Sequence, residues 1–179
     1  MRLFIPISKE FKLLNKIISM TVRKYIDKVL EWGLVFLMSI LVIDVLWQVT
    51  SRYIMNSPSS FTDELAGFLL IWVGLLGAAY VAGRREHLAI DLLIQRSKPR
   101  RKFQLEVIIS IVIVIFSLTV MVIGGTWLVY TRFYLSVKSA ALGLPLGIVY
   151  LVLPLSGILI AYFDIDNLYN MVKQNRKKE

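Results

Sequence analysis

The sequence of 179 residues contains no cysteine and a single histidine, His87. The absence of cysteine excludes disulfide bonds, thiolate catalysis, zinc–cysteine sites and iron–sulfur clusters within this chain. One histidine cannot supply a bis-histidine haem or an HExxH metal site. Charged residues are also scarce, at 18% of the chain against roughly 25% in soluble domains. Together these shortages disfavour a membrane enzyme or a haem protein.

Apolar residues are abundant instead and make up 57% of the chain. They gather in four runs, each long enough to supply the roughly 20 residues a helix needs to cross a bilayer. Because the membrane offers no water to the backbone, such runs are helical, and the period-two alternation of a β-barrel is absent. We predict an all-α, polytopic membrane protein whose four transmembrane helices are 31–51, 61–83, 107–130 and 143–163, joined by 52–60, 84–104 and 131–142 and flanked by 1–30 and 164–179.

Two of the predicted spans carry signs of irregularity. The third has 24 uncharged residues, which at about 1.5 Å per residue exceeds a hydrocarbon core of about 30 Å. We therefore expect it to tilt or to bend near Gly124 and Gly125. In the fourth span, Pro154 cannot donate a hydrogen bond to the Tyr150 carbonyl, which predicts a kink. The first span is longer than a signal-peptide core and lacks a convincing cleavage site, so it is kept as a membrane helix.

The basic residues are distributed unequally between the two sides of the membrane. Eighteen Lys and Arg residues lie in 1–30, 84–104 and the tail, whereas three lie in the other two connections. The positive-inside rule therefore places both termini in the cytoplasm. The net charge of +9 is explained by contact with membrane lipids and not by a nucleic-acid patch. Apolar residues at helical spacing within 1–30 predict an amphipathic interfacial helix, with a partly disordered basic tail as the alternative.

Asp44 is the only acidic residue well inside a predicted span, and Gln48 follows it by one helical turn. Intramembrane acids are costly and usually face protein or water. A proton or ion relay is one interpretation, and a structural hydrogen bond between helices is the other. A relay needs a second titratable group at similar depth, which the other three spans lack. We therefore favour an intramembrane polar contact made by Asp44 and Gln48.

The second span begins with polar residues that have more than one interpretation. Ser60 and Asp63 have the spacing of a capping box. Glu64 could pair with Arg52 across the short connection, or it could present its charge to a periplasmic partner. Further along, Gly74, Ala78 and Ala82 recur every four residues, which predicts a seam that lets two helix backbones approach closely.

Two smaller groups of residues each have more than one interpretation. His87 and Asp91 are one helical turn apart, but with Glu86 they offer too few ligands for a convincing metal site. Aromatic residues cluster at the end of the third span and are typical of an interfacial belt, although exposed aromatics also suit a partner. This aromatic group comprises Trp127, Tyr130, Phe133 and Tyr134.

Two stretches of the sequence resemble the DctQ-like small membrane subunits of tripartite ATP-independent periplasmic (TRAP) transporters. The segment 52–57 is similar to the one that closes the first helix in that family, and 61–93 is similar to its second-helix signature. The resemblance extends over about residues 33–165, with the same four spans and orientation. The residues that carry it are Arg52, Tyr53, Asn56, Ser57, Asp63, Glu64, Trp72, Gly77, Glu86, His87 and Asp91.

This resemblance implies a scaffold role in a bacterial inner-membrane importer. A large membrane subunit would hold substrate and sodium and move as an elevator, while a soluble periplasmic binding protein would deliver the substrate. The substrates would be carboxylate-bearing organic acids, such as C4-dicarboxylates or sialic acids. This subunit would be no enzyme and would need no cofactor of its own, because sodium is expected in the large subunit.

Docking of the periplasmic binding protein must be weak and quickly reversible, which favours exposed charges. The candidates are Glu64 first, then Asp63, Arg132 and Lys138. An alternative function is an autonomous small proton-coupled exporter that acts as a homo-oligomer through Asp44. That alternative predicts transport by this chain alone.

Overall fold

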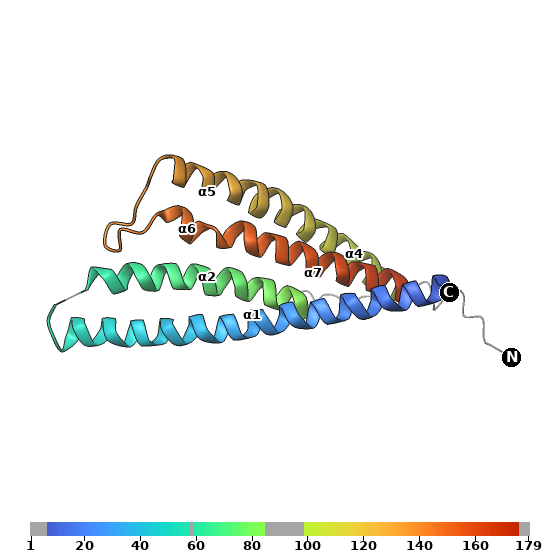
Figure 1. The fold of residues 1–179 in the computed structure, drawn as a ribbon, viewed down its shortest axis with the longest axis horizontal. Helices are drawn as coiled ribbons and strands as arrows, with labels where there is room; N and C mark the ends of the chain where they lie inside the picture. Colours follow the sequence, from blue (N-terminus) through green and yellow to red (C-terminus); the bar gives the residue numbers. More distant parts are fainter. Residues whose placement is uncertain (1–6, 58, 85–98, 176–179) are drawn as a thin grey trace.

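The computed structural model describes residues 7–57, 59–84 and 99–175 (Figure 1). The described residues are helical apart from short loops and one isolated bridge between Lys138 and Pro145. The helices are α1 (Ile7–Tyr53), α2 (Ser60–Arg84), α4 (Pro99–Phe116), the π-helix η1 (Ser117–Gly124), α5 (Gly125–Tyr134), α6 (Leu146–Tyr150) and α7 (Val152–Asn175).

The four predicted membrane helices are confirmed, with longer bounds than expected. Four helical segments are long and apolar enough to cross a membrane: Thr21–Tyr53, Ser60–Arg84, Phe103–Tyr134 and Leu146–Lys173. The fourth begins at Leu146 and not at residue 143, because Gly143 has a positive φ of 65° and belongs to the preceding loop. It also continues through most of the predicted tail, as far as Asn175.

Helix α1 runs without a break from Ile7 to Tyr53. The boundary predicted at residue 30, between an interfacial helix and the first span, is therefore not a helix end. No proline lies within α1, and Gly33 is its single glycine, so nothing in the local sequence interrupts it. Its 47 residues extend over about 70 Å, well beyond a bilayer of about 40–45 Å. Placement of its first part in the membrane interface stays a prediction.

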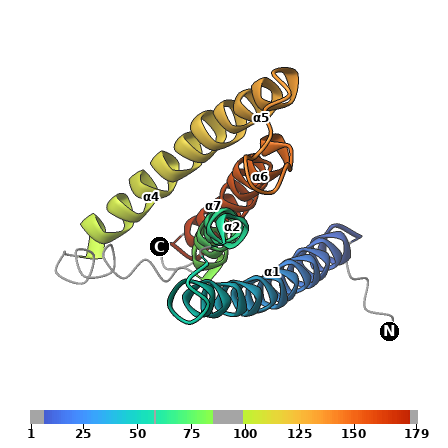
Figure 2. The same ribbon diagram turned by 90° about the vertical axis from the view of Figure 1, so that its left-hand side faces the viewer.

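Helix α2 occupies the centre of the bundle. It packs against α1 on one side and against α7 on the other, and α7 in turn contacts α4 and η1 (Figures 1 and 2). One core cluster joins α1, α2 and α7 through Leu30, Leu76, Val152 and Phe163. A second cluster joins α2, η1 and α7 through Ala79, Ala82, Met121 and Ile160.

The irregularities expected in the third and fourth spans have structural counterparts. In the third, the π-helix ends at Gly124 and α5 begins at Gly125. In the fourth, the helix is interrupted at Leu151, three residues before Pro154. A proline ring clashes with the carbonyl four residues earlier and removes one helical hydrogen bond, which explains an interruption at this position.

Candidate functional site

The Glu64 carboxylate lies near the start of α2 and binds the loop between α5 and α6. The Ser139 hydroxyl donates a hydrogen bond to Oε2. The backbone N–H of Ala140 donates to Oε1 at 3.1 Å, and those of Ala141 and Leu142 donate to Oε2 at 2.9 and 3.1 Å. Hydrogen bonds to a charged acceptor are stronger than neutral ones. We call this group, Glu64 with residues 139–142, the loop clamp.

The loop is folded so that its backbone donors converge on that carboxylate. The Ser139 N–H donates to the Leu144 carbonyl at 2.9 Å, and the Gly143 N–H donates to the Ser139 carbonyl at 3.0 Å. Gly143 adopts a φ of +65°, which glycine tolerates without steric cost. Successive N–H groups arranged in this way form an anion-binding concavity. Glu64 supplies the anion, which fixes the loop to α2.

Asp63 faces the opposite neighbour and connects α2 to α1. The Gln48 side-chain amide donates a hydrogen bond to Asp63 Oδ1, and an Arg52 guanidinium nitrogen lies 3.5 Å from the same oxygen. Arg52 therefore pairs with Asp63 and not with Glu64. The Asp63 and Arg52 side chains are about half exposed, so the ion pair stabilises the fold by at most about 1 kcal/mol. Helix α2 begins at Ser60, but the Asp63 N–H donates to the Ser59 carbonyl at 3.4 Å, whereas the capping-box pattern predicts a bond to the Ser60 side chain.

Asp44 is buried, with 7% of its surface exposed. Its Oδ2 atom has no hydrogen-bond partner within the described part of the chain. The described part of the chain contains no hydrogen bond between Asp44 and Gln48, whose side-chain amide donates to Asp63 instead. Asp44 and Gln48 share a face of α1, but the polar contacts on that face join Gln48 and Arg52 to Asp63 of α2 and do not include Asp44.

Asp44→Asn tests whether this buried acid has a role in proton transfer. Asparagine keeps the size of the side chain but cannot ionise, so uptake by the assembled transporter is expected to stay near the wild-type rate. Transport assays on wild type and variant at equal membrane levels check this. Full assembly with abolished uptake would instead support a proton relay.

The second polar group, at the other end of α2, joins three helices. The Arg23 guanidinium of α1 pairs with the Asp166 carboxylate of α7 and donates to the Gly83 carbonyl near the end of α2. It also donates to Asn167 Oδ1 at 3.1 Å and lies 5.8 Å from the centre of the Phe163 ring. We call Arg23, Gly83, Asp166 and Asn167 the terminal clamp.

Asn167 completes the terminal clamp by donating from its Nδ2 atom to the Ala82 carbonyl at 3.1 Å. The last carbonyls of a helix have no donor within the helix. Here side chains of α1 and α7 donate to two of these carbonyls in α2, those of Gly83 and Ala82. No pattern in the sequence indicates this group. Arg23 and Asp166 are 143 residues apart, and neither lies in a recognisable motif.

The predicted seam of small residues does not form a helix contact inside this subunit along its whole length. Gly74 and Ala78 are exposed, and a Cβ added to Gly74 would meet nothing within 4 Å. Ala82 alone of the three is buried, at 3% exposure. The close approach of helices occurs elsewhere, where a Cβ at Gly157 would lie 2.7 Å from Met121 Cβ.

The other predicted residues have mainly structural positions. The Trp72 indole N–H donates to the Val149 carbonyl at 3.1 Å, which joins α2 to α6. Asn56 has a φ of 50° just after α1, and the Ser57 N–H donates to the Ser51 carbonyl at 3.1 Å. Such a left-handed residue is a common way to end a helix, and asparagine is suited to it. Of the remaining motif residues, Tyr53 is exposed and Gly77 is half-buried. Glu86, His87 and Asp91 are outside the described residues.

The aromatic residues at the end of the third span form an exposed row on α5. The Trp127 and Tyr130 rings have centroids 6.4 Å apart, and those of Tyr130 and Tyr134 are 6.0 Å apart and stacked. Arg132, one of the predicted docking residues, places its guanidinium 5.7 Å from the Tyr150 ring centre. Lys138, another, is exposed on the adjoining loop.

The fold and these contacts define a four-span helical membrane protein in which two groups of polar side chains, the loop clamp and the terminal clamp, tie helices and a loop to one another. A protein-family model described as "Tripartite ATP-independent periplasmic transporters, DctQ component" matches residues 40–174. The match includes most of the chain, and the chain belongs to this family of TRAP transporter small membrane subunits.

Individual relatives agree with the family. The chain is 28% identical over 150 residues to a putative TRAP transporter small permease protein of Haemophilus influenzae, covering 83% of this chain and 90% of the relative. It is 24% identical over 151 residues to the sialic acid TRAP transporter small permease protein SiaQ of Vibrio cholerae, covering 84% and 86%. A shorter match, 36% over 72 residues, covers 39% of this chain and 11% of the sialic acid TRAP transporter permease protein SiaT of Haemophilus influenzae.

Proposed function

We propose that this TRAP small subunit is a static scaffold for a large membrane subunit that carries the substrate. The observation that supports this most directly is the pair of clamps at opposite ends of α2. The loop clamp binds α2 to the α5–α6 loop, and the terminal clamp binds α2 to α1 and α7. Polar groups used in this way hold helices in fixed positions. Moving substrate would instead require polar groups that line a path.

The proposed assembly is an importer of the bacterial inner membrane, with both termini of this chain in the cytoplasm. The unequal distribution of basic residues supports this orientation. The match to a sialic acid TRAP transporter permease protein of Haemophilus influenzae supports a large permease as the partner. A soluble periplasmic binding protein is the third component expected from the family.

The proposed substrates are carboxylate-bearing organic acids of the sialic acid or C4-dicarboxylate type, driven inward by a sodium gradient. The small-subunit relative that handles sialic acid supports the first class. We place sodium in the large subunit and propose no cofactor for this chain. The alternative of an autonomous proton-coupled exporter is not favoured, because the chain belongs to a family of transporter small subunits and matches small permease relatives over most of its length.

For docking of the binding protein we propose the charged residues around the α5–α6 loop. Lys138 and Asp63 are exposed, and Arg132 lies on the adjacent last turn of α5. Glu64 differs from these three because its carboxylate already accepts hydrogen bonds from the loop. It would contribute by holding the loop in shape, whereas exposed charges would steer the encounter.

Uptake by purified components tests the proposed function. Proteoliposomes would contain this chain and its large subunit, with binding protein and radiolabelled sialic acid or C4-dicarboxylate outside. We expect sodium-dependent uptake when all three proteins are present and loss of uptake when this chain is omitted. Proton-driven transport by liposomes that contain this chain alone would contradict the proposal.

A further inference from the structure

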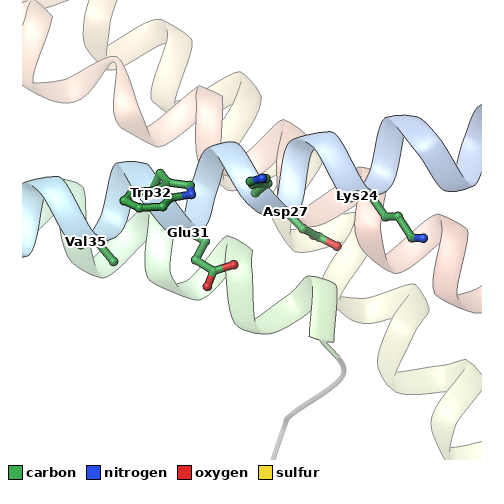
Figure 3. Close-up of a pocket in the computed structure, with 6 residues that line it drawn as sticks. Lys24, Asp27, Glu31, Trp32 and Val35 are labelled. Carbon is green, nitrogen blue, oxygen red and sulfur yellow. The ribbon is translucent and has the colours of Figure 1, made fainter.

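A shallow groove of about 470 Å³ lies along α1, close to the terminal clamp. Its lining comes from one helix and alternates in charge. Figure 3 shows the carboxylates of Asp27 and Glu31 and the ammonium of Lys24 along the same side of α1, with the Trp32 ring beside them. The full lining is Lys24, Asp27, Lys28, Glu31, Trp32 and Val35.

The four charged side chains of this groove are spaced at three and four residues, as intrahelical ion pairs require. Nevertheless, the ion pairs found among the described residues are those of Arg23 with Asp166 and of Arg52 with Asp63. Asp27 Oδ1 is buried, and it has no hydrogen-bond partner in the described part of the chain. A buried carboxylate oxygen without a donor is unfavourable. The groove therefore presents two acids and two bases that form no ion pair with one another in the described part of the chain.

The length of α1 supports the predicted position of the groove in a layer of lipid headgroups. From Lys24 to Arg52 the helix rises by about 42 Å, which equals the thickness of a whole bilayer of about 40–45 Å. Arg52 lies at the opposite end of the bundle, beside Asp63. Trp32 is 66% exposed, and tryptophan is typical of the boundary between headgroups and hydrocarbon. Val35 continues the groove toward the hydrocarbon.

We propose that this groove binds the headgroup of a zwitterionic phospholipid with a primary ammonium, namely phosphatidylethanolamine. Its phosphate would accept hydrogen bonds from Lys24 and Lys28. Its ammonium, which has three N–H donors, would donate to Asp27 and Glu31. The acyl chains would leave past Trp32 and Val35 into the hydrocarbon.

The charge balance of the groove decides between phospholipid classes. Two acids and two bases do not form the basic cluster that attracts anionic lipids. Phosphatidylglycerol offers no cation to the two carboxylates. Phosphatidylcholine has a cation, but its methylated nitrogen has no N–H to donate. The headgroup that satisfies both signs with hydrogen bonds is ethanolamine phosphate.

Native mass spectrometry of the full chain in mild detergent tests this proposal. The probes are phosphatidylethanolamine, phosphatidylcholine and phosphatidylglycerol with identical acyl chains. We expect phosphatidylethanolamine to bind about fivefold more tightly than the other two, the size expected from partly exposed charge pairs. Soluble phosphoethanolamine should not compete at equal concentration, because it lacks the acyl chains.

Charge-removing variants separate this site from general attraction to the membrane. Asp27→Asn with Glu31→Gln should remove the preference for phosphatidylethanolamine, and Lys24→Gln with Lys28→Gln should weaken all three phospholipids. Asp27→Glu with Glu31→Asp keeps the charges and should keep the preference. The matched control, Lys173→Gln with Glu106→Gln, changes the same types of charge outside the groove and should leave the preference unchanged.

Three results would overturn the proposal. One is equal binding of the three phospholipids by the wild-type chain. Another is a preference for phosphatidylethanolamine that survives in the Asp27→Asn, Glu31→Gln variant. The third is displacement of phosphatidylethanolamine when the large membrane subunit binds, because that would assign the groove to protein contact.

Discussion

Glu64→Gln is expected to release the α5–α6 loop and to lower the stability of the chain. Three backbone N–H groups and the Ser139 hydroxyl converge on the Glu64 carboxylate. Glutamine offers one acceptor oxygen and turns an NH₂ group toward these donors, so some of them lose their partner. Loss of hydrogen bonds to a charged acceptor destabilises the folded state more than loss of neutral ones. Thermal unfolding of the full chain in mild detergent, with limited proteolysis of loop 135–145, measures the effect.

Asp63→Asn provides a matched control for Glu64→Gln. It also neutralises one acid in the first turns of α2, but it affects a half-exposed ion pair whose loss costs at most about 1 kcal/mol. A Glu64→Gln chain with wild-type stability would contradict the loop clamp. If its uptake were then slow mainly at low concentrations of binding protein, and less so at high salt, Glu64 would belong to the docking surface instead.

Gly157→Leu is expected to prevent folding of the subunit. A Cβ at Gly157 would lie 2.7 Å from Met121 Cβ and 3.1 Å from the Ser117 carbonyl oxygen, so even alanine does not fit without movement of η1. Overpacking a core with single methylenes costs about 1–3 kcal/mol, and leucine adds more at a contact with backbone. We expect little folded protein after membrane extraction, as measured by size-exclusion chromatography.

Gly74→Leu is the control for that experiment. The same change occurs in another transmembrane helix, but a Cβ at Gly74 meets nothing within 4 Å. The yield of folded subunit should match the wild type. Equal yields for Gly157→Leu and Gly74→Leu would show that η1 and α7 do not pack as closely as this structure has them.

The hydrophobic pattern is sufficient to predict the helices of this protein. Each span is a long apolar run, and a membrane leaves the backbone few alternatives to a helix. Pro154 also predicts the interruption at Leu151, because the missing N–H is a local property. The end of α1 near Asn56 and the start of α2 at Ser60 likewise depend on nearby residues. Local chemistry therefore predicts where elements begin, break and end.

Contacts between distant residues could not be predicted in the same way. Arg23 reaches Asp166 across most of the chain, and basic residues are common near membrane surfaces. The sequence suggests Arg52 or a periplasmic protein as the partner of Glu64, but Glu64 binds the loop between α5 and α6. Its partners are mainly backbone N–H groups, which every residue other than proline possesses, so no side-chain pattern marks them.

The glycine pattern shows the same limit. Gly74, Ala78 and Ala82 have a regular spacing, yet two of the three are exposed. Gly157 has no such pattern, yet it lies at a close helix contact. Spacing indicates which small residues share a face of a helix, but which face is covered depends on the packing of all the helices. The boundary predicted at residue 30 is wrong for a related reason. The charged residues of 1–30 indicate where the chain leaves the hydrocarbon, but they do not end the helix, which runs from Ile7 to Tyr53.

Co-purification tests the central claim, that this chain is the small subunit of a two-part membrane permease, most directly. The full chain, tagged at one terminus, would be expressed together with its large subunit and extracted in mild detergent. The account predicts that the large subunit is retained with the chain at equal stoichiometry, as measured by native mass spectrometry. A stable homo-oligomer of this chain, without the large subunit and with transport activity of its own, would contradict it.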